Sequence, residues 1–155
     1  MSVNIHGSCV ALGGKGVLLL GRSGAGKSDL ALRLIDGGAR LVADDRCEIF
    51  VRGGKLWACA PRTITGLIEM RGLGIVAMPH TKSAAIAMVV RLGTAPIRLP
   101  KPAFYLPPQG IGQVQPVPLI MVKPAAASAT ARIRAALAAF SQNRFRDTFN
   151  AKSST

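Results

Sequence analysis

The chain contains the stretch Gly21-Arg22-Ser23-Gly24-Ala25-Gly26-Lys27-Ser28, which matches the pattern G-x-x-x-x-G-K-[ST] at every fixed position. An aliphatic run at 17–20 precedes it and a helix-like segment at 28–36 follows it, which is the context that this motif requires. Glycines let successive backbone N–H groups point at an anion. The N-terminus of the following helix adds its positive dipole end. The stretch therefore predicts a nucleotide-phosphate site; the alternative is a glycine-rich turn in which Lys-Ser occurs by chance.

Two side chains of this stretch carry specific chemistry. Lys27 can reach the β- and γ-phosphates of a nucleotide, and the Ser28 hydroxyl can ligate Mg²⁺. We therefore predict that the whole loop binds the cofactor, through Gly21, Arg22, Ser23, Gly24, Ala25, Gly26, Lys27 and Ser28.

The composition favours one domain in a reducing compartment. A chain of 155 residues with 49% hydrophobic content can bury one core. No run approaches the roughly 18 apolar residues of a membrane span, and the first residues lack the features of a signal peptide. Three cysteines without C-x-x-C spacing argue against disulfides and a zinc site. We expect a cytoplasmic protein with no membrane partner.

The charge balance is strongly basic, with 20 Lys and Arg against 7 Asp and Glu and a formal net charge of +13. Such a field favours acidic partners. The basic residues are scattered, however, and only five Phe, one Tyr and one Trp could stack on bases. We interpret the charge as a basic surface around a phosphate site and do not expect a nucleic-acid partner.

The pattern along the chain predicts one α/β domain at 1–142 and a polar, frayed tail at 143–155. Glycine turns and apolar runs predict strands at 3–12, 17–20, 40–43, 47–51, 55–59, 84–92 and 119–122. Helices are expected at 28–36 and after Ser128, where Ile133, Ala136, Leu137 and Phe140 form an apolar stripe. The segment 96–118 carries seven prolines and is predicted to be a loop.

Asp44 and Asp45 follow the predicted strand at 40–43. Adjacent strand residues point to opposite faces, so both can serve one site only if the strand ends there. A carboxylate beside a phosphate loop can hold Mg²⁺ or act as a general base toward an attacking hydroxyl. The alternative is a solvated turn that contains two Asp residues.

Glu69 and Arg71 are embedded among apolar residues, where an unpaired charge would be costly. A metal-binding Glu with a phosphate-binding Arg would explain the pair, and a structural ion pair would explain it nearly as well. His6 has two interpretations: it is a catalytic residue, or it is a histidine in the core or at the edge of the sheet.

Several segments together resemble the catalytic domain of HPr kinase/phosphorylase, the bacterial enzyme that phosphorylates a serine of the phosphocarrier protein HPr. They are Ile5-His6-Gly7, Gly16 to Ser28, Arg40-Leu41-Val42-Ala43-Asp44-Asp45 and Glu69-Met70-Arg71-Gly72-Leu73-Gly74-Ile75. The resemblance covers residues 3–76 and is to the catalytic domain alone, so we expect a short form of the family.

The resemblance implies a role for each matching residue. Lys27 and the loop amides would bind the phosphates of ATP, and Ser28 with Glu69 would hold Mg²⁺. Asp45 would be the catalytic base, Asp44 would support it, His6 would lie near the reacting phosphate, and Arg71 would bind phosphate.

The resemblance also implies a fold and a partner. The fold would be a P-loop domain like the nucleotide-binding core of phosphoenolpyruvate carboxykinases. The substrate would be a serine of HPr or a paralogue, in the regulation of carbon or nitrogen metabolism, and the chain would form a homo-oligomer, a hexamer in the family. The family's basic R-P-G-R-N-like loop is not recognisable, so the reverse, phosphorylase reaction stays open. Two alternatives are a regulatory ATP-binding module without phosphotransfer and a small-molecule kinase or phosphatase.

Overall fold

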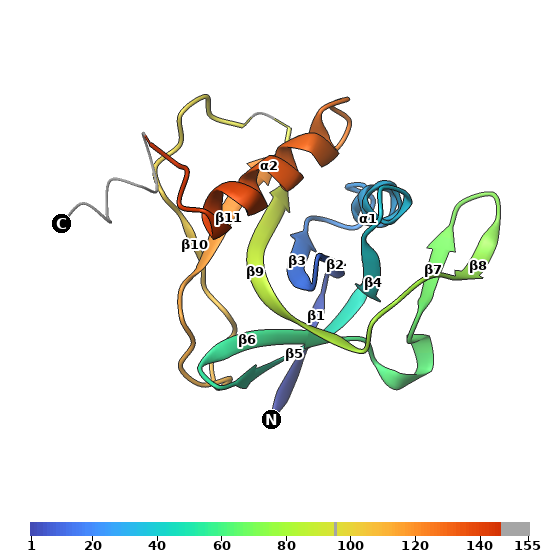
Figure 1. Ribbon diagram of the computed structural model, residues 1–155. Coiled ribbons are helices and arrows are strands. Elements are labelled where there is room, and N and C mark those ends of the chain that lie inside the picture. Colours follow the sequence, from blue (N-terminus) through green and yellow to red (C-terminus); the bar gives the residue numbers. More distant parts are fainter. Residues whose placement is uncertain (95, 147–155) are drawn as a thin grey trace.

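The computed structural model describes residues 1–94 and 96–146 as a mixed α/β fold (Figure 1). The elements follow one another as β1 (Ser2–His6), β2 (Ser8–Leu12), β3 (Lys15–Leu20), α1 (Lys27–Asp36), β4 (Arg40–Ala43), β5 (Arg46–Arg52), β6 (Lys55–Cys59), a 3₁₀ turn (Arg62–Ile64), β7 (Leu67–Met70), β8 (Gly74–Ala77), β9 (Ser83–Leu92), β10 (Phe104–Tyr105), β11 (Val117–Val122) and α2 (Ala129–Ser141).

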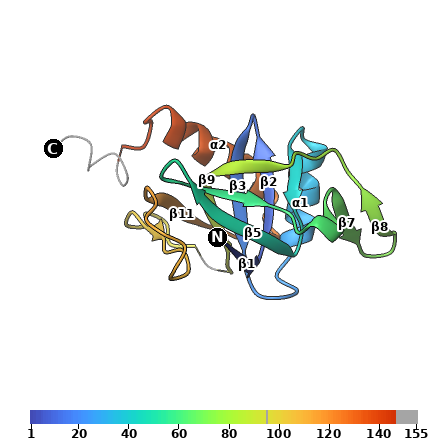
Figure 2. The ribbon, with the colours of Figure 1, turned by 90° about the horizontal axis from the view of Figure 1, so that it is seen from below.

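The main sheet has the strand order β1-β5-β6-β9-β3-β2-β4. β9 is its centre, because it pairs in parallel with β3 and β11 and antiparallel with β6. In Figure 1 the helices α1 and α2 lie above β9, β3, β2 and β4, and β5 and β6 lie below. Figure 2 shows the same arrangement from below, with β5 and β6 crossing in front of the central strands. The hairpin β7–β8 forms a separate two-stranded sheet at one side.

This arrangement creates a core on each face of the central strands. In β3, Val17 and Leu19 pack with the helices, whereas Leu18 packs with β5 and β6. All three side chains are fully buried, which explains why β3 is an unbroken apolar run. The apolar face of α1, with Leu30, Leu34 and Ile35, packs into the first core.

α2 begins and packs where the sequence predicts. Ser128 occupies the N-cap position, although its hydroxyl accepts a hydrogen bond from Arg132 Nε instead of capping a backbone N–H. Ile133 and Leu137 of the predicted stripe are buried against the sheet. Within the described residues, no helix is long and apolar enough to cross a membrane.

The predicted single strand at 3–12 is wrong, because the chain breaks at Gly7 into β1 and β2. β1 pairs with β5, whereas β2 pairs with β3 and β4. A Cβ at position 7 would lie 3.0 Å from Leu20 Cδ2 and 3.2 Å from the carbonyl oxygen of Leu19, so the break brings the backbone close to β3.

The proline-rich segment 96–118 is mostly irregular, as predicted, but it contains β10, and β11 begins at Val117 instead of Leu119. At the start of the predicted tail, the ring centroid of Phe145 lies 4.5 Å from that of Phe140. The rest of that tail, 147–155, lies outside the described residues. Its predicted fraying and the boundary at 142 therefore stay predictions.

Candidate functional site

The loop between β3 and α1 is built from the stretch that opens the sequence. Gly24 has φ 81° and Gly26 φ 103°, left-handed values that disfavour residues with a Cβ. Lys27 is the first helical residue, and 6% of it is exposed. Its Nζ donates to the carbonyl oxygens of Gly21 and Arg22 at 2.8 and 3.0 Å. The ammonium therefore lies across the loop with its third N–H left for an anion.

Asp44 lies beneath this loop and is 6% exposed. Its Oδ1 accepts hydrogen bonds from Ser28 Oγ at 2.7 Å and from Ser8 Oγ at 3.0 Å. Its Oδ2 accepts a longer bond, 3.4 Å, from the backbone N–H of Glu69. These donors compensate for burying a carboxylate. Asp44 thus fixes the Ser28 hydroxyl and joins the loop to β7.

Asp45 is the next residue, but its side chain is 63% exposed. Its φ of 66° lies in the left-handed region that non-glycine residues seldom adopt. Its Oδ1 lies 2.7 Å from His6 Nε2, and the imidazole is also partly exposed. An exposed, oriented carboxylate is the geometry that a general base needs.

Glu69 lies within β7 and Arg71 lies in the turn to β8, and both are exposed. The expectation that apolar neighbours bury these charges is wrong. The hairpin projects from the body (Figure 1), so that Leu73 and Ile75 are also exposed, at 77% and 71%.

A cavity of about 480 Å³ brings most of the predicted residues together. Its walls come from the loop, α1, Asp45 and the β7–β8 hairpin. They comprise Ser23, Gly24, Gly26, Lys27, Ser28, Asp29, Leu32, Asp45, Glu69, Met70, Arg71 and Leu73. Cations, a hydroxyl and carboxylates thus share one space above the helix N-terminus, which suits a phosphate and its metal ion.

The other predicted residues lie around this cavity. Asp44 is buried below it, and His6, Gly21, Arg22 and Ala25 line an adjoining cavity of about 780 Å³. Arg91 and Tyr105 also line that second cavity. Burial raises the pKa of the Tyr105 hydroxyl, while the charge of Arg91 opposes the rise.

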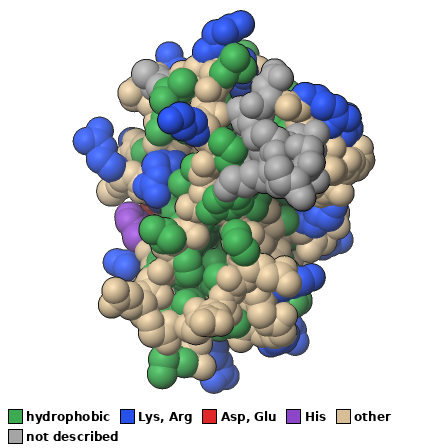
Figure 3. Space-filling model, turned by 90° about the vertical axis from the view of Figure 1, so that its left-hand side faces the viewer, with side chains coloured by type: hydrophobic (Ala, Val, Ile, Leu, Met, Phe, Trp, Pro, Cys, Tyr) green, Lys and Arg blue, Asp and Glu red, His purple; other side chains and the backbone are tan. Residues whose placement is uncertain are grey.

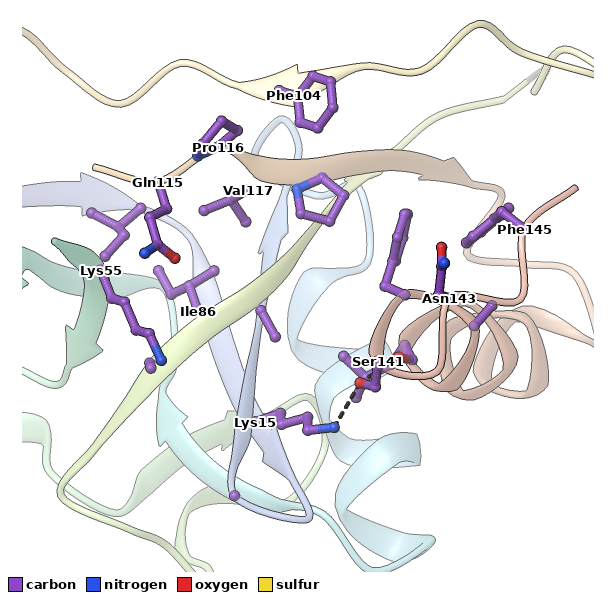
Figure 4. Close-up of a pocket in the computed structure, with 18 residues that line it drawn as sticks. Lys15, Lys55, Ile86, Phe104, Gln115, Pro116, Val117, Ser141, Asn143 and Phe145 are labelled. Carbon is purple, nitrogen blue, oxygen red and sulfur yellow. Dashed lines mark hydrogen bonds between the residues drawn. The ribbon is translucent and has the colours of Figure 1, made fainter. Parts of the chain in front are cut away.

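A third cavity, of about 790 Å³, holds none of the predicted site residues. Figure 4 shows Lys15 and Lys55 at its rim and Val117 and Phe104 in its wall, beside the end of α2. Lys15 Nζ donates to Ser141 Oγ at 2.6 Å, which ties the β2–β3 turn to that helix.

The cysteines take no part in the site. Cys9 and Cys47 are buried, Cys59 is partly buried, and all three are unpaired. Burial raises the pKa of the Cys47 thiol to about 12, with Cys59 and Glu48 adding to the rise. Cys9 and Cys47 are core residues, whereas Cys59 lies at the edge of the core.

The sequence reasoning missed Ser8. It is fully buried, donates to Asp44 and accepts a 3.1 Å hydrogen bond from the backbone N–H of Asp45. The available signal was a hydroxyl at the start of the otherwise apolar segment Ser8–Leu12.

Comparison with known proteins identifies the family. The model of the HPr Serine kinase C-terminal domain matches residues 1–92, which is more than half of the chain. The chain belongs to this family. The predicted resemblance is thereby confirmed.

Relatives in the HPr Serine kinase C-terminal domain family share the half of the chain that carries the loop. An HPr kinase/phosphorylase of Caldanaerobacter subterraneus is 53% identical over 75 residues, and one of Clostridium tetani is 48% identical over 75 residues. Each match covers 48% of this chain but only 25% of the relative, so the chain spans about a quarter of the length of these proteins.

The fold has a solved counterpart. The structure of the Hpr(Ser) kinase/phosphatase from Coxiella burnetii superposes with a TM-score of 0.75 at 23% sequence identity, over 91% of this chain and 97% of that one. Because it covers 91% of the chain, this likeness extends the shared fold past residue 92. The mixed α/β class predicted from the sequence is confirmed.

Proposed function

We propose that this protein is an ATP- and Mg²⁺-dependent kinase that phosphorylates a serine on a small phosphocarrier protein, HPr or a paralogue. One observation carries the proposal. Lys27 and Ser28, which suit the phosphates, share one cavity with the exposed carboxylate of Asp45, which suits the acceptor hydroxyl. Membership of the family supports HPr-like proteins as the acceptor class.

The proposed reaction is in-line phosphoryl transfer. The acceptor serine oxygen forms a bond to the γ-phosphorus while the bond from that phosphorus to the bridging oxygen breaks, and ADP leaves. Asp45 accepts the serine proton, and His6 at 2.7 Å orients the carboxylate. Lys27 and the N-terminal amides of α1 offset the charge on the phosphates. Positioning and charge neutralisation provide most of the rate enhancement.

The donor set fits Mg²⁺. Within the described chain, no three His, Cys, Asp or Glu side chains gather to hold a metal ion on their own. Mg²⁺ needs no such cage, because it takes one or two protein ligands with phosphate oxygens and water. Ser28 and Glu69 would hold it, since Ser28 gives its proton to Asp44 and keeps its lone pairs free. When bound, the ion neutralises the phosphate charge.

The remaining predictions are part of the proposal. Unpaired thiols at all three cysteines suit a cytoplasmic protein. The phosphoenolpyruvate carboxykinase-like core, the homo-oligomer and the role in carbon or nitrogen regulation rest on the family resemblance. Arg71, exposed on the cavity wall, is proposed to bind phosphate.

The proposed activity is tested by intact-mass measurement of purified HPr and its paralogues after incubation with the protein, ATP and Mg²⁺. We expect a gain of one phosphate. Asp45→Asn should lower the rate by about 10²–10⁴-fold, the usual contribution of a general base. Asp36→Asn is the matched control, because Asp36 is exposed at the end of α1 and carries the same charge.

Two outcomes would change the assignment. No phosphate on any carrier from the same cell would rule out the kinase and leave the regulatory ATP-binding module. Turnover of ATP with a small alcohol but no protein would indicate a small-molecule kinase. The phosphorylase direction is tested by incubating the phosphorylated carrier with inorganic phosphate.

A further inference from the structure

Two interruptions of regular strand structure face each other beside the candidate site. β1 and β2 are interrupted at Gly7, and β4 and β5 are interrupted at Asp44 and Asp45. The ladder pairs His6 with Arg46 on one side of the gap and Cys9 with Ala43 on the other. Regular sheet pairing therefore stops in both segments, β1–β2 and β4–β5, at the level of the two carboxylates.

Three consecutive residues bridge this gap to Asp45. His6 Nε2 lies 2.7 Å from its carboxylate, the Gly7 N–H donates to its carbonyl oxygen at 3.0 Å, and its N–H donates to Ser8 Oγ at 3.1 Å. Every polar group of Asp45 except its outer carboxylate oxygen is thus held by the 6–8 segment. A left-handed backbone is strained at a residue with a Cβ and needs such contacts to persist.

The Ser8 hydroxyl contacts Asp44 as well as Asp45. A hydroxyl has one proton, and a carboxylate can only accept. Ser8 therefore gives its proton to Asp44 Oδ1, which leaves a lone pair for the Asp45 N–H. The same Asp44 oxygen accepts from Ser28 Oγ. One buried hydroxyl thus links the orientation of Ser28 to that of Asp45.

We propose that Ser8 is a positioning residue for phosphoryl transfer, which sets the geometry of the base Asp45 and, through Asp44, of Ser28. The assignment rests on the proposed kinase function. A serine that only filled the core would be replaceable by alanine, since both are small. A relay hydroxyl is not, because its loss leaves the Asp45 N–H and one Asp44 contact without a partner.

The kinetic test compares Ser8→Ala, Ser8→Thr and the wild type in the intact-mass assay. We expect Ser8→Ala to lower kcat by about 10- to 100-fold, with KM for ATP changed less than about 3-fold. Ser8→Thr keeps the hydroxyl and should recover most of the lost rate. Cys9→Ala is the matched control, since Cys9 is buried on the same strand and its thiol donates to the carbonyl oxygen of Val10. A kcat for Ser8→Ala within 3-fold of the wild type would overturn the proposal.

A second measurement does not depend on activity. In amide hydrogen exchange followed by NMR, the Asp45 N–H should exchange at least 10-fold faster in Ser8→Ala than in the wild type, relative to the buried Ile49 amide. Cys9→Ala should leave it unchanged. Equal Asp45 exchange in Ser8→Ala and wild type would also overturn the role of Ser8. Absence of phosphotransfer by the wild type would instead refute the kinase function, and the exchange comparison would still decide whether Ser8 holds Asp45.

Discussion

Asp44 and Asp45 are neighbours in the chain but have opposite surroundings. Asp44 is buried and accepts hydrogen bonds from two hydroxyls, whereas Asp45 is exposed and held by an imidazole. The prediction that both can serve one site only at a strand end agrees with the structure, because β4 ends at Ala43. The left-handed turn at Asp45 is what brings the second carboxylate to the cavity.

Among single residues, Cys47 makes stability depend on pH. Its thiol has a pKa of about 12 in the fold against 9.0 when unfolded, mainly because of burial. Between these values the unfolded chain has lost the proton that the folded chain keeps. Folding stability therefore falls as pH rises from about 9 toward about 12, by up to about 1.4 kcal/mol per pH unit for this group.

We expect Cys47→Ala to flatten that fall. Urea unfolding at pH 8, 9, 10 and 11 gives the free energy of unfolding for each variant. Cys59→Ala is the comparison, because Cys59 is only partly buried and its pKa is raised less. If Cys47→Ala and the wild type lost stability in parallel above pH 9, this account of the buried thiol would be wrong.

At the scale of elements, periodicity and turn residues predicted both helices and most strands. They did so because β3, β9 and α1 bury what their patterns mark as apolar. The break at Gly7 was missed because its cause is contact with β3, which a local pattern does not contain. The same limit explains Ser8, whose partners lie 36 and 37 residues away. Exposure of Glu69 and Arg71 was missed because the projecting hairpin leaves apolar neighbours in solvent.

α2 provides an element-scale prediction. Ile133 is fully buried against the sheet core, so Ile133→Ala should lower the free energy of unfolding by about 2–4 kcal/mol, as deletion of a buried aliphatic side chain does. Arg132→Ala on the exposed side of the same helix should change it by about 0.5 kcal/mol or less. Chemical denaturation measures both. A similar loss in the two variants would contradict a special contribution from the burial of Ile133, since alanine weakens the helix propensity of neither position.

At the scale of the whole molecule, one face combines apolar surface with basic charge. The face that carries β10 and β11 shows a band of hydrophobic side chains bordered by lysines and arginines (Figure 3). Phe104, Leu106 and Met121 are among the exposed apolar residues. With a net charge of +13, the protein should attract an acidic partner at long range.

We expect Arg91→Glu to raise the KM for the phosphocarrier by about 5- to 10-fold with little change in kcat, because Arg91 lines the cavity next to His6 and Arg22. Lys55→Glu makes the same change of charge at the third cavity and should have a smaller effect. Steady-state kinetics at 0.05 and 0.5 M NaCl should show the Arg91 effect shrinking as salt screens it. Equal effects of the two variants would show that total charge, not the position of Arg91, governs binding of the carrier.

The central place of β9 also determines the order in which the molecule can be assembled. β3 pairs with β9 across about 70 residues of chain, and β9 in turn needs β11, a further 30 residues on, to cover its second half. Pairings so distant in sequence are slow to form, because the entropy of closing the intervening loops is lost first. The strand that leads into the Gly21–Ser28 loop therefore pairs early with its hairpin partner β2 but acquires its other neighbour, β9, late. A nascent chain that ends before β9 would carry the whole nucleotide motif without the central strand that joins β2, β3 and β4 to β1, β5 and β6.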